Sequence, residues 1–290
     1  MENLTDIGAV RRLLDKYDFR FSKALGQNFL INPSVCPRMA EASGVDRSSG
    51  VLEIGPGIGV LTRELAARAG KVVAVELDQR LLPVLEETLR DTGPVKVIHG
   101  DAMKLDLAAL LREEFPDMPV AVCANLPYYI TSPILMGLLE SRLPFTTITV
   151  LVQKEAAQRL CAKPGTRECG AVTLAVQYYA EAKTLFPVSR GSFLPAPKVD
   201  SAVMQLRIRR EPACAVKDEA CLFRLIRAAF GQRRKTLSNA LTGAGITKEE
   251  AGAALAAAGI DPGARAEQLR LEQFAALADA VTERGILASR

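Results

Sequence analysis

The sequence VLEIGPGIG, residues 51–59, decides the fold, because a short apolar strand passes directly into a loop with three glycines. A helical pattern follows at Val60–Ala69, and the next apolar strand, Lys71–Glu76, ends on a carboxylate. Glycine lets the chain turn tightly and lets a ligand approach the backbone. This order of strand, glycine loop, helix and acidic strand end is typical of an α/β sheet that binds a ligand containing ribose.

The alternation of strand and helix continues from this stretch to about residue 160. Short apolar strands separated by helices predict a parallel sheet with helices on both faces. Two later segments, Lys183–Phe186 and Ala202–Arg209, alternate as antiparallel strands do, and we expect them at the far edge of the sheet. The expected parallel strands are Val51–Ile54, Lys71–Glu76, Val95–Ile98, Val120–Ala124 and Thr147–Val152.

Ligands of such sheets bind at the carboxyl ends of the strands, where the glycine loop, Glu76 and Asp101 are expected. Position 60 is valine, where the dinucleotide fingerprint has a glycine, and this favours a ligand without a pyrophosphate. Glu76 is suited to accept both hydroxyls of a ribose. Asp101 either accepts a hydrogen bond from an adenine amine or caps the helix that follows it.

The fourth strand end carries Asn125-Leu126-Pro127-Tyr128-Tyr129. Alone, this is also an ordinary turn after a strand. With the other loops it suits transfer of a group to a planar amine. The Asn125 side-chain oxygen and the Pro127 carbonyl accept the N–H groups of the amine, and Tyr128 stacks on its ring. One ligand that contains ribose and adenine but no phosphate spans all four loops, and it is S-adenosylmethionine, a methyl donor.

A stiff loop with two prolines, Ser192–Ser201, separates the two antiparallel strands. It presents Phe193 either as the second face of a clamp for the acceptor base, opposite Tyr128, or as an anchor in the core. The sequence leaves these two interpretations about even.

From about Glu211 the sequence becomes entirely helical and basic. Arg190 to Lys235 contains eleven Lys and Arg against four Asp and Glu, whereas the whole chain has a net charge of +4. Arg233, Arg234 and Lys235 lie between two of the expected helices. A run of like charges is usually only a solvent-exposed face. Here the rest of the chain is weakly acidic, so the basic run indicates a surface that binds a polyanion. Such a surface contacts phosphates rather than bases.

Composition excludes several other classes of function. His99 is the only histidine and the six cysteines form no CxxC pair, so we expect no metal site and no histidine-based catalysis, and a structural role for His99. No signal-peptide pattern and no membrane-spanning run occur, so we expect a cytoplasmic protein with reduced thiols.

The chain, from about Ser22 to about Ala280, resembles the ribosomal RNA adenine dimethyltransferases of the KsgA/RsmA type. The order and number of the matching motifs make this resemblance specific. The motifs are Gly26–Leu30 (GQNFL), Glu53–Gly57, Glu76, Gly100–Ala102, Asn125–Tyr129, Phe193–Ser201 and Arg233–Lys235.

The resemblance implies a Rossmann-like class I methyltransferase sheet with a small all-helical C-terminal domain. Residues 1–210 then form the S-adenosylmethionine-binding methyltransferase domain, with 1–21 as an N-terminal extension of unassigned role, and residues 211–290 bind ribosomal RNA. In that family the donor site includes Asn28 and Leu30, beside Gly55, Glu76, Asp101 and Asn125.

The implied reaction is S-adenosylmethionine-dependent N6,N6-dimethylation of two adjacent adenosines in the 3′-terminal hairpin of 16S rRNA. The implied partner is this RNA within the small ribosomal subunit or its precursor, bound by a monomer during subunit biogenesis. A 23S rRNA adenine dimethylase of the antibiotic-resistance type is the first alternative, and an assembly factor in which methylation is incidental is the second. An NAD-type oxidoreductase is disfavoured by Val60.

Overall fold

The structure is a computed structural model that describes residues 3–22 and 24–287. Residues 22–28, which precede the first strand, are called the early loop. Met1 and Glu2 of the expected N-terminal extension, Lys23 of the early loop and residues 288–290 of the expected C-terminal domain lie outside the described residues. None of the helices in the described part of the chain is long and apolar enough to cross a membrane.

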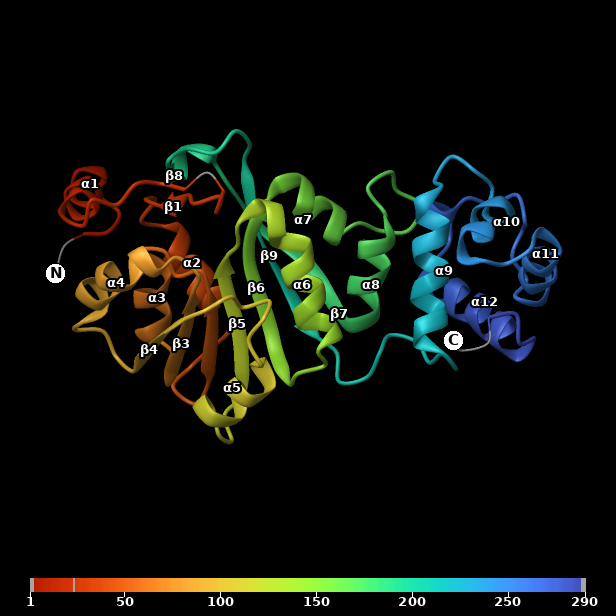
Figure 1. Cartoon of the computed structure of the whole chain (residues 1–290), viewed down its shortest axis with the longest axis horizontal. Helices are drawn as coiled ribbons and strands as arrows, with labels where there is room; N and C mark the ends of the chain where they lie inside the picture. Colours follow the sequence, from red (N-terminus) through yellow and green to blue (C-terminus); the bar gives the residue numbers. More distant parts are fainter. Residues whose placement is uncertain (1–2, 23, 288–290) are drawn as a thin grey trace. The chain divides into compact units, whose positions relative to one another are not determined.

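A seven-stranded sheet of order β4-β3-β2-β5-β6-β9-β7 forms the centre of the first part of the chain (Figure 1). The first five strands in this order are parallel, as predicted, and β9 pairs antiparallel with β6. The two strands expected at the edge, β7 and β9, lie there. The strands are β2 (Gly50–Ile54), β3 (Lys71–Glu76), β4 (Val95–His99), β5 (Val120–Asn125), β6 (Phe145–Gln153), β7 (Ala180–Val188) and β9 (Ser201–Ile208).

The parallel strands are joined by helices, which is the connection that parallel pairing requires. Each helix begins within a few residues of the preceding strand, so the strand-end loops are short and share one edge of the sheet. The connecting helices are α3 (Val60–Ala66), η1 (Gln79–Leu81) with α4 (Leu82–Leu89), α5 (Leu107–Glu114), and η2 (Tyr128–Ile130) with α6 (Thr131–Glu140), and α7 (Lys154–Leu160) follows the last parallel strand.

One face of the sheet is covered by α2 (Val35–Ala42) and α3, which pack together against alternate residues of the strands. All of these side chains are buried, because a strand of a parallel sheet between two layers of helices has no solvent-facing side. The strand residues in this cluster are Val51, Val72, Cys123, Leu151 and Val203.

The N-terminal segment folds onto the opposite end of the sheet from β7. Helix α1 (Ile7–Lys16) begins at Asp6, whose carboxylate accepts a hydrogen bond from the Ala9 N–H at 2.7 Å. Its apolar side chains share a buried cluster with α4. After α1, the short strand β1 (Phe29–Leu30) pairs antiparallel with β8 (Phe193–Leu194), which joins two motifs that are far apart in the sequence.

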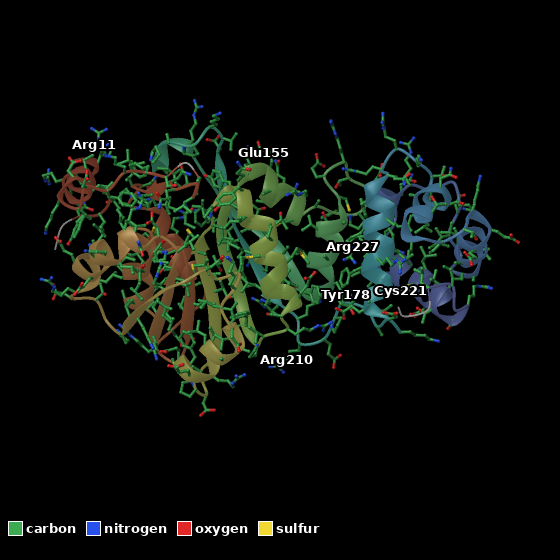
Figure 2. All side chains as sticks on the ribbon, viewed as in Figure 1. Arg11, Glu155, Tyr178, Arg210, Cys221 and Arg227 are labelled. Carbon is green, nitrogen blue, oxygen red and sulfur yellow. The ribbon has the colours of Figure 1, made fainter. Side chains whose placement is uncertain are left out.

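The chain divides into two compact units, Met1–Ala157 with Ala182–Ile208, and Gln158–Glu181 with Arg209–Arg290. The predicted boundary at residue 210 therefore misses one segment: helix α8 (Ala171–Tyr179) belongs with the C-terminal helices. The reason is aromatic packing, because the Tyr178 and Tyr179 rings lie 5.3 and 5.7 Å from that of Phe223. Figure 2 labels Tyr178 at this position.

The second unit is helical, as the sequence predicts. The Thr247 and Glu250 side chains form the expected capping box at the start of α11, and Gly285, with φ of 64°, follows α12. The helices of its C-terminal part are α9 (Glu219–Gly231), α10 (Leu237–Ala240), η4 (Leu241–Ala244), α11 (Lys248–Ala257), η5 (Ala266–Gln268) and α12 (Leu271–Glu283).

Candidate functional site

A cavity opens in the first unit at the carboxyl ends of β2, β3, β4 and β5. The early loop before β1 forms part of its wall, so five segments meet there. The structure thus brings together eight of the residues predicted from the sequence. They are Asn28, Leu30, Gly55, Glu76, Asp101, Asn125, Pro127 and Tyr128.

The glycine loop forms one wall of the cavity in a conformation that only glycine adopts readily. Gly55, Gly57 and Gly59 all have positive φ, of 70°, 61° and 88°. A Cβ atom on Gly55 would meet no protein atom within 4 Å, whereas one on Gly59 would lie 2.9 Å from Leu89. Gly59 is therefore required by packing against α4, and Gly55 leaves open space at the cavity.

Glu76 ends β3 with its carboxylate almost completely buried. Its Oε2 accepts a hydrogen bond from the Gly57 N–H at 3.2 Å, and its Oε1 accepts one from the Asp78 N–H at 2.8 Å. Burial raises the pKa of Glu76, and these two backbone hydrogen bonds oppose the rise. Each carboxylate oxygen keeps a lone pair for a further donor, so the two oxygens can accept hydrogen bonds from the two hydroxyls of one ribose.

Asp101 lies in the loop after β4, and it does not cap the helix that follows. Its Oδ1 accepts a hydrogen bond from the Met103 N–H at 3.0 Å, and its Oδ2 lies 3.5 Å from the Lys104 Nζ. Helix α5 is capped instead by Asp106, which accepts a hydrogen bond from the Ala109 N–H at 2.9 Å. The helix-cap interpretation of Asp101 is therefore wrong, and a ligand-facing role stays the prediction.

Asn125 ends β5 with its side-chain amide in a defined orientation. Its Nδ2 donates a hydrogen bond to the Asn28 carbonyl at 3.1 Å, so the Oδ1 is the atom left to accept. No donor among residues 3–22 and 24–287 is hydrogen-bonded to this Oδ1. This orientation also ties the early loop to the fourth strand end.

The Pro127 carbonyl is not available for its predicted role as an acceptor for the target amine. It accepts hydrogen bonds from the Ile130 N–H and the Thr131 Oγ1–H, both at 3.2 Å, so both of its lone pairs are in use. The chain turns into η2 and α6 at this point, and the helix start takes up the carbonyl. The preceding carbonyl, of Leu126, accepts no hydrogen bond from the described residues, and Leu126 lines the cavity. The second acceptor is thus better assigned to Leu126, with Pro127 as the residue that fixes it.

Tyr128 lines the cavity with its ring held by its hydroxyl. The hydroxyl and the Ser201 Oγ are hydrogen-bonded at 2.6 Å, and partial burial raises the pKa of the phenol. Ser201 is the first residue of β9 and is fully buried, so it is a fixed partner. Tyr129, to which the sequence assigned no role, also lines the cavity and is 56% exposed.

Phe193 does not line the cavity. It is 3% exposed and belongs to the buried cluster that includes Cys36, Cys123 and Val203. In this structure it anchors the proline-containing loop to the core, which is the second of the two interpretations from the sequence. Its predicted stacking role requires a different position of the ring.

Glu53, in β2, is a cavity residue to which the sequence assigned no role. It is 1% exposed, and its Oε2 has no hydrogen-bond partner among the described residues. Burial raises the pKa of Glu53 to about 8, and the negative charge of Glu76 adds to this rise. The carboxyl group is therefore largely protonated at neutral pH. The sequence marks Glu53 as an acid in an apolar run and as the first residue of the Glu53–Gly57 motif.

His99, the only histidine, supports this edge of the sheet. It ends β4, and its Nε2 is hydrogen-bonded to the Leu77 carbonyl at 3.2 Å. Leu77 directly follows Glu76, so the contact holds the strand end that carries the acid. This is the structural role that the sequence predicts.

The basic residues Arg233, Arg234 and Lys235 belong to the second unit, in the turn between α9 and α10. All three are exposed, as are Arg224 and Arg227 on α9, the latter labelled in Figure 2. None of these five cations forms an ion pair with a residue that the structure describes. Arg233 donates a hydrogen bond through its Nη2 to the Arg167 carbonyl at 2.7 Å.

Comparisons with known proteins show the family of the chain. Residues 18–283 match the family model described as "Ribosomal RNA adenine dimethylase". A relative from Geobacillus sp. (strain WCH70), "Ribosomal RNA small subunit methyltransferase A", is 48% identical over 94% of this chain and 96% of its own length. A protein of the same description from Shouchella clausii is 50% identical over 93% of this chain and 92% of its own length.

Two solved structures are similar over most of the chain. A dimethyladenosine transferase from Plasmodium falciparum has a TM-score of 0.75 and 26% identity, and the match covers 89% of this chain and 98% of the other. The 23S rRNA methyltransferase ErmE has a TM-score of 0.67 and 31% identity, and the match covers 88% of this chain and all of the other. The Rossmann-like class I methyltransferase fold with a helical C-terminal region is thereby confirmed.

Proposed function

Since the chain belongs to the ribosomal RNA adenine dimethylase family, and is thus an rRNA adenine dimethyltransferase, we propose that its substrate is 16S rRNA. It uses S-adenosylmethionine to dimethylate, at N6, two adjacent adenosines in the 3′-terminal hairpin of that RNA. We propose further that it acts as a cytoplasmic monomer on the small ribosomal subunit or its precursor, as part of subunit biogenesis.

The small-subunit substrate is favoured over the 23S rRNA alternative by the degree of similarity. The relatives described as small-subunit methyltransferases are 48% and 50% identical, compared with 31% for ErmE. The basic helical unit is also consistent with a large folded RNA as partner, because it carries cations in excess and phosphate contacts are the main source of affinity for RNA. We propose that Arg233, Arg234 and Lys235 make such contacts.

The cavity fits S-adenosylmethionine, which supplies an electrophilic methyl group on its sulfonium. Glu76 accepts the two ribose hydroxyls, and Asp101 accepts a hydrogen bond from the adenine amine. Gly55 leaves room for the ligand against the backbone, and Asn28 of the early loop and Leu30 of β1 close the cavity. Val60, in place of a glycine, agrees with a donor that has no pyrophosphate.

The observation that carries the proposal is the orientation of Asn125. Its Nδ2 donates to the Asn28 carbonyl, so its Oδ1 keeps its lone pairs for the amine of the target adenine. The Oδ1 and the Leu126 carbonyl accept the two N–H groups of the adenine amine, and this turns the nitrogen lone pair toward the methyl group. Both oxygens also stabilise the positive charge that develops on N6 before a proton leaves to water.

Tyr128 holds the target adenine out of its stack by contact with one face of its ring. The hydrogen bond to Ser201 fixes the plane of the phenol before the base arrives. Phe193 as the second face of this clamp stays a prediction. An assembly role in addition to catalysis is compatible with the same surfaces.

The test is methylation of small subunits that lack the modification, with labelled donor and mass spectrometry of the rRNA nucleosides. We expect N6,N6-dimethyladenosine from small subunits and none from a parallel incubation with large subunits. An Asn125→Ala variant is expected to lose about 100-fold or more in kcat, by analogy with removal of one oxyanion-hole group. Because Asn125 also lines the donor cavity, calorimetry measures the affinity of the variant for S-adenosylmethionine, and kcat is compared at saturating donor. Full methyl transfer by this variant contradicts the proposed role of Asn125.

A further inference from the structure

Arg80, which does not line the cavity, joins the N-terminal segment to the loop that follows Glu76. Its Nε and Nη2 donate to the Asp78 Oδ1 and Oδ2 at 2.8 and 2.6 Å. Its Nη1 donates to the Arg20 carbonyl at 3.3 Å, and its guanidinium lies 5.0 Å from the centre of the Phe19 ring. One side chain thus makes a bidentate ion pair and two contacts with residues outside the sheet.

Asp78, the partner of Arg80, is hydrogen-bonded to two segments of the cavity wall. It is 6% exposed, and its backbone N–H donates to the Glu76 Oε1 at 2.8 Å. Its Oδ2 also accepts a hydrogen bond from the Gln27 Nε2 at 2.8 Å. The other end of the Gln27 amide accepts a hydrogen bond from the Ser22 N–H at 2.8 Å, so the early loop is held from both sides.

Gln27 leads directly to the acceptor side of the cavity. The next residue, Asn28, offers its carbonyl to the Asn125 Nδ2. Asp78 is therefore connected through one hydrogen bond to Glu76, at the donor ribose, and through the Gln27–Asn28 backbone to Asn125, at the target amine.

Apolar contacts follow the same route from the N-terminal segment to the glycine loop. The rings of Phe19 and Phe21 lie 5.9 and 5.2 Å from the ring of Phe29. Phe29 in turn covers Gly57, where a Cβ atom would lie 3.1 Å from the ring. Buried side chains of α1, including Leu13 and Leu14, belong to the same cluster. The N-terminal segment thus packs behind the wall of the donor cavity.

We propose that Arg80 and Asp78 are positioning residues for methyl transfer, which hold Glu76 and Asn125 at a fixed separation, and that residues 3–22 form a strap that completes this arrangement. The inference rests on the proposed function and assigns a role to the N-terminal extension. Arginine is required at position 80 because its planar fork makes two parallel hydrogen bonds to a carboxylate while a third N–H reaches the Arg20 carbonyl. Without it, the nearly buried Asp78 carboxylate lacks a countercharge close to Glu76.

The test compares Arg80→Lys with Arg47→Lys in the full-length protein. Arg47 is a matched control, because its guanidinium also makes several hydrogen bonds, to the carbonyls of Ala66, Ala67 and Ala69 at the end of α3. Arg80→Lys is expected to weaken S-adenosylmethionine binding about tenfold and to lower kcat about tenfold, with KM for small subunits unchanged. Arg47→Lys is expected to lower the melting temperature and to leave both values unchanged.

A milder variant keeps the inference testable if Arg80→Lys does not fold. Gln27→Ala removes the hydrogen bonds that hold the early loop, to Asp78 and from the Ser22 N–H, and leaves the Arg80–Asp78 ion pair in place, so kcat is expected to fall more than the affinity for the donor. Equal donor affinity and kcat in Arg80→Lys and Arg47→Lys would overturn the inference, as would a wild-type kcat in Gln27→Ala. Failure of the wild-type protein to bind the donor or to methylate small subunits would instead refute the proposed function.

Discussion

The donor cavity and the basic turn between α9 and α10 differ in what fixes their side chains. The cavity is built from strand ends, glycines with positive φ and buried acids, of which Glu76 accepts two backbone hydrogen bonds. The side chains of Arg234 and Lys235 in the basic turn are exposed and make no hydrogen bond or ion pair with the described residues. A site that acts on one atom needs fixed geometry, whereas a surface that binds phosphates needs mainly charge. Substitutions are therefore expected to have large effects in the cavity and graded effects in the turn.

Two glycines of the glycine loop, Gly55 and Gly59, give the largest expected effect. Gly55 lines the cavity and Gly59 does not, so their substitutions distinguish loss of ligand space from loss of packing. Gly59→Ala places a methyl group 2.9 Å from Leu89 at φ of 88°, and we expect it to lower the free energy of unfolding by about 2–3 kcal/mol. Gly55→Ala has a similar backbone cost but meets no neighbour within 4 Å. It is expected to destabilise by about 1 kcal/mol and to weaken donor binding more than Gly59→Ala does.

Denaturant unfolding and calorimetry with S-adenosylmethionine measure the two quantities separately. If Gly55→Ala binds the donor as well as the wild type, the open space beside this glycine is not part of the donor site. If both variants unfold alike, the contact with Leu89 does not constrain the loop.

The parts of the cavity that depend on strand position are visible in the sequence, and those that depend on side-chain direction are not. Gly55, Glu76 and Asn125 were predicted because each ends a recognisable apolar strand, and parallel strands bring their ends together. The Pro127 carbonyl was assigned wrongly, because its direction depends on where the next helix begins. The residue at which this helix begins cannot be predicted from the pattern of a strand followed by a turn.

Two features outside the cavity that the sequence left open or missed depend on packing between distant segments. Phe193 is buried because β8 pairs with β1, some 160 residues earlier in the sequence. The segment Gln158–Glu181 joins the helical unit because Tyr178 and Tyr179 contact Phe223. Neither contact leaves a periodic pattern in the sequence. The Arg80 network is missed for the same reason, since its partners belong to separate loops.

Glu53 gives the second prediction, an intermediate effect within the cavity wall. The pKa of its carboxyl rises from an ordinary value of 4.5 to about 8, because burial disfavours the charged form. Between these two values the folded protein binds one more proton than the unfolded chain, so its stability decreases as pH rises. The slope is at most about 1.4 kcal/mol per pH unit. Glu53→Gln removes this proton and is expected to show a flatter dependence.

Chemical denaturation at pH 5, 6, 7 and 8 compares Glu53→Gln with the wild type. The variant is expected to gain in relative stability as pH rises through this range and to differ little at pH 5. The same pH dependence in both proteins would mean that Glu53 titrates normally in the fold.

The smallest expected effect lies in the basic turn, where a single cation contributes one of several phosphate contacts. Arg234→Ala is expected to weaken binding to unmethylated small subunits about threefold at physiological salt. It should also reduce the slope of log affinity against log salt concentration by about 1, because one fewer counterion is released. Donor affinity and kcat should not change, since these depend on the cavity. Lys248→Ala, which removes an exposed charge at the start of α11, is the control and should leave the slope unchanged. A loss of kcat in Arg234→Ala would contradict the distinction between the donor cavity and the basic turn. A residue of the turn would then fix the geometry of the reacting groups rather than only supply charge.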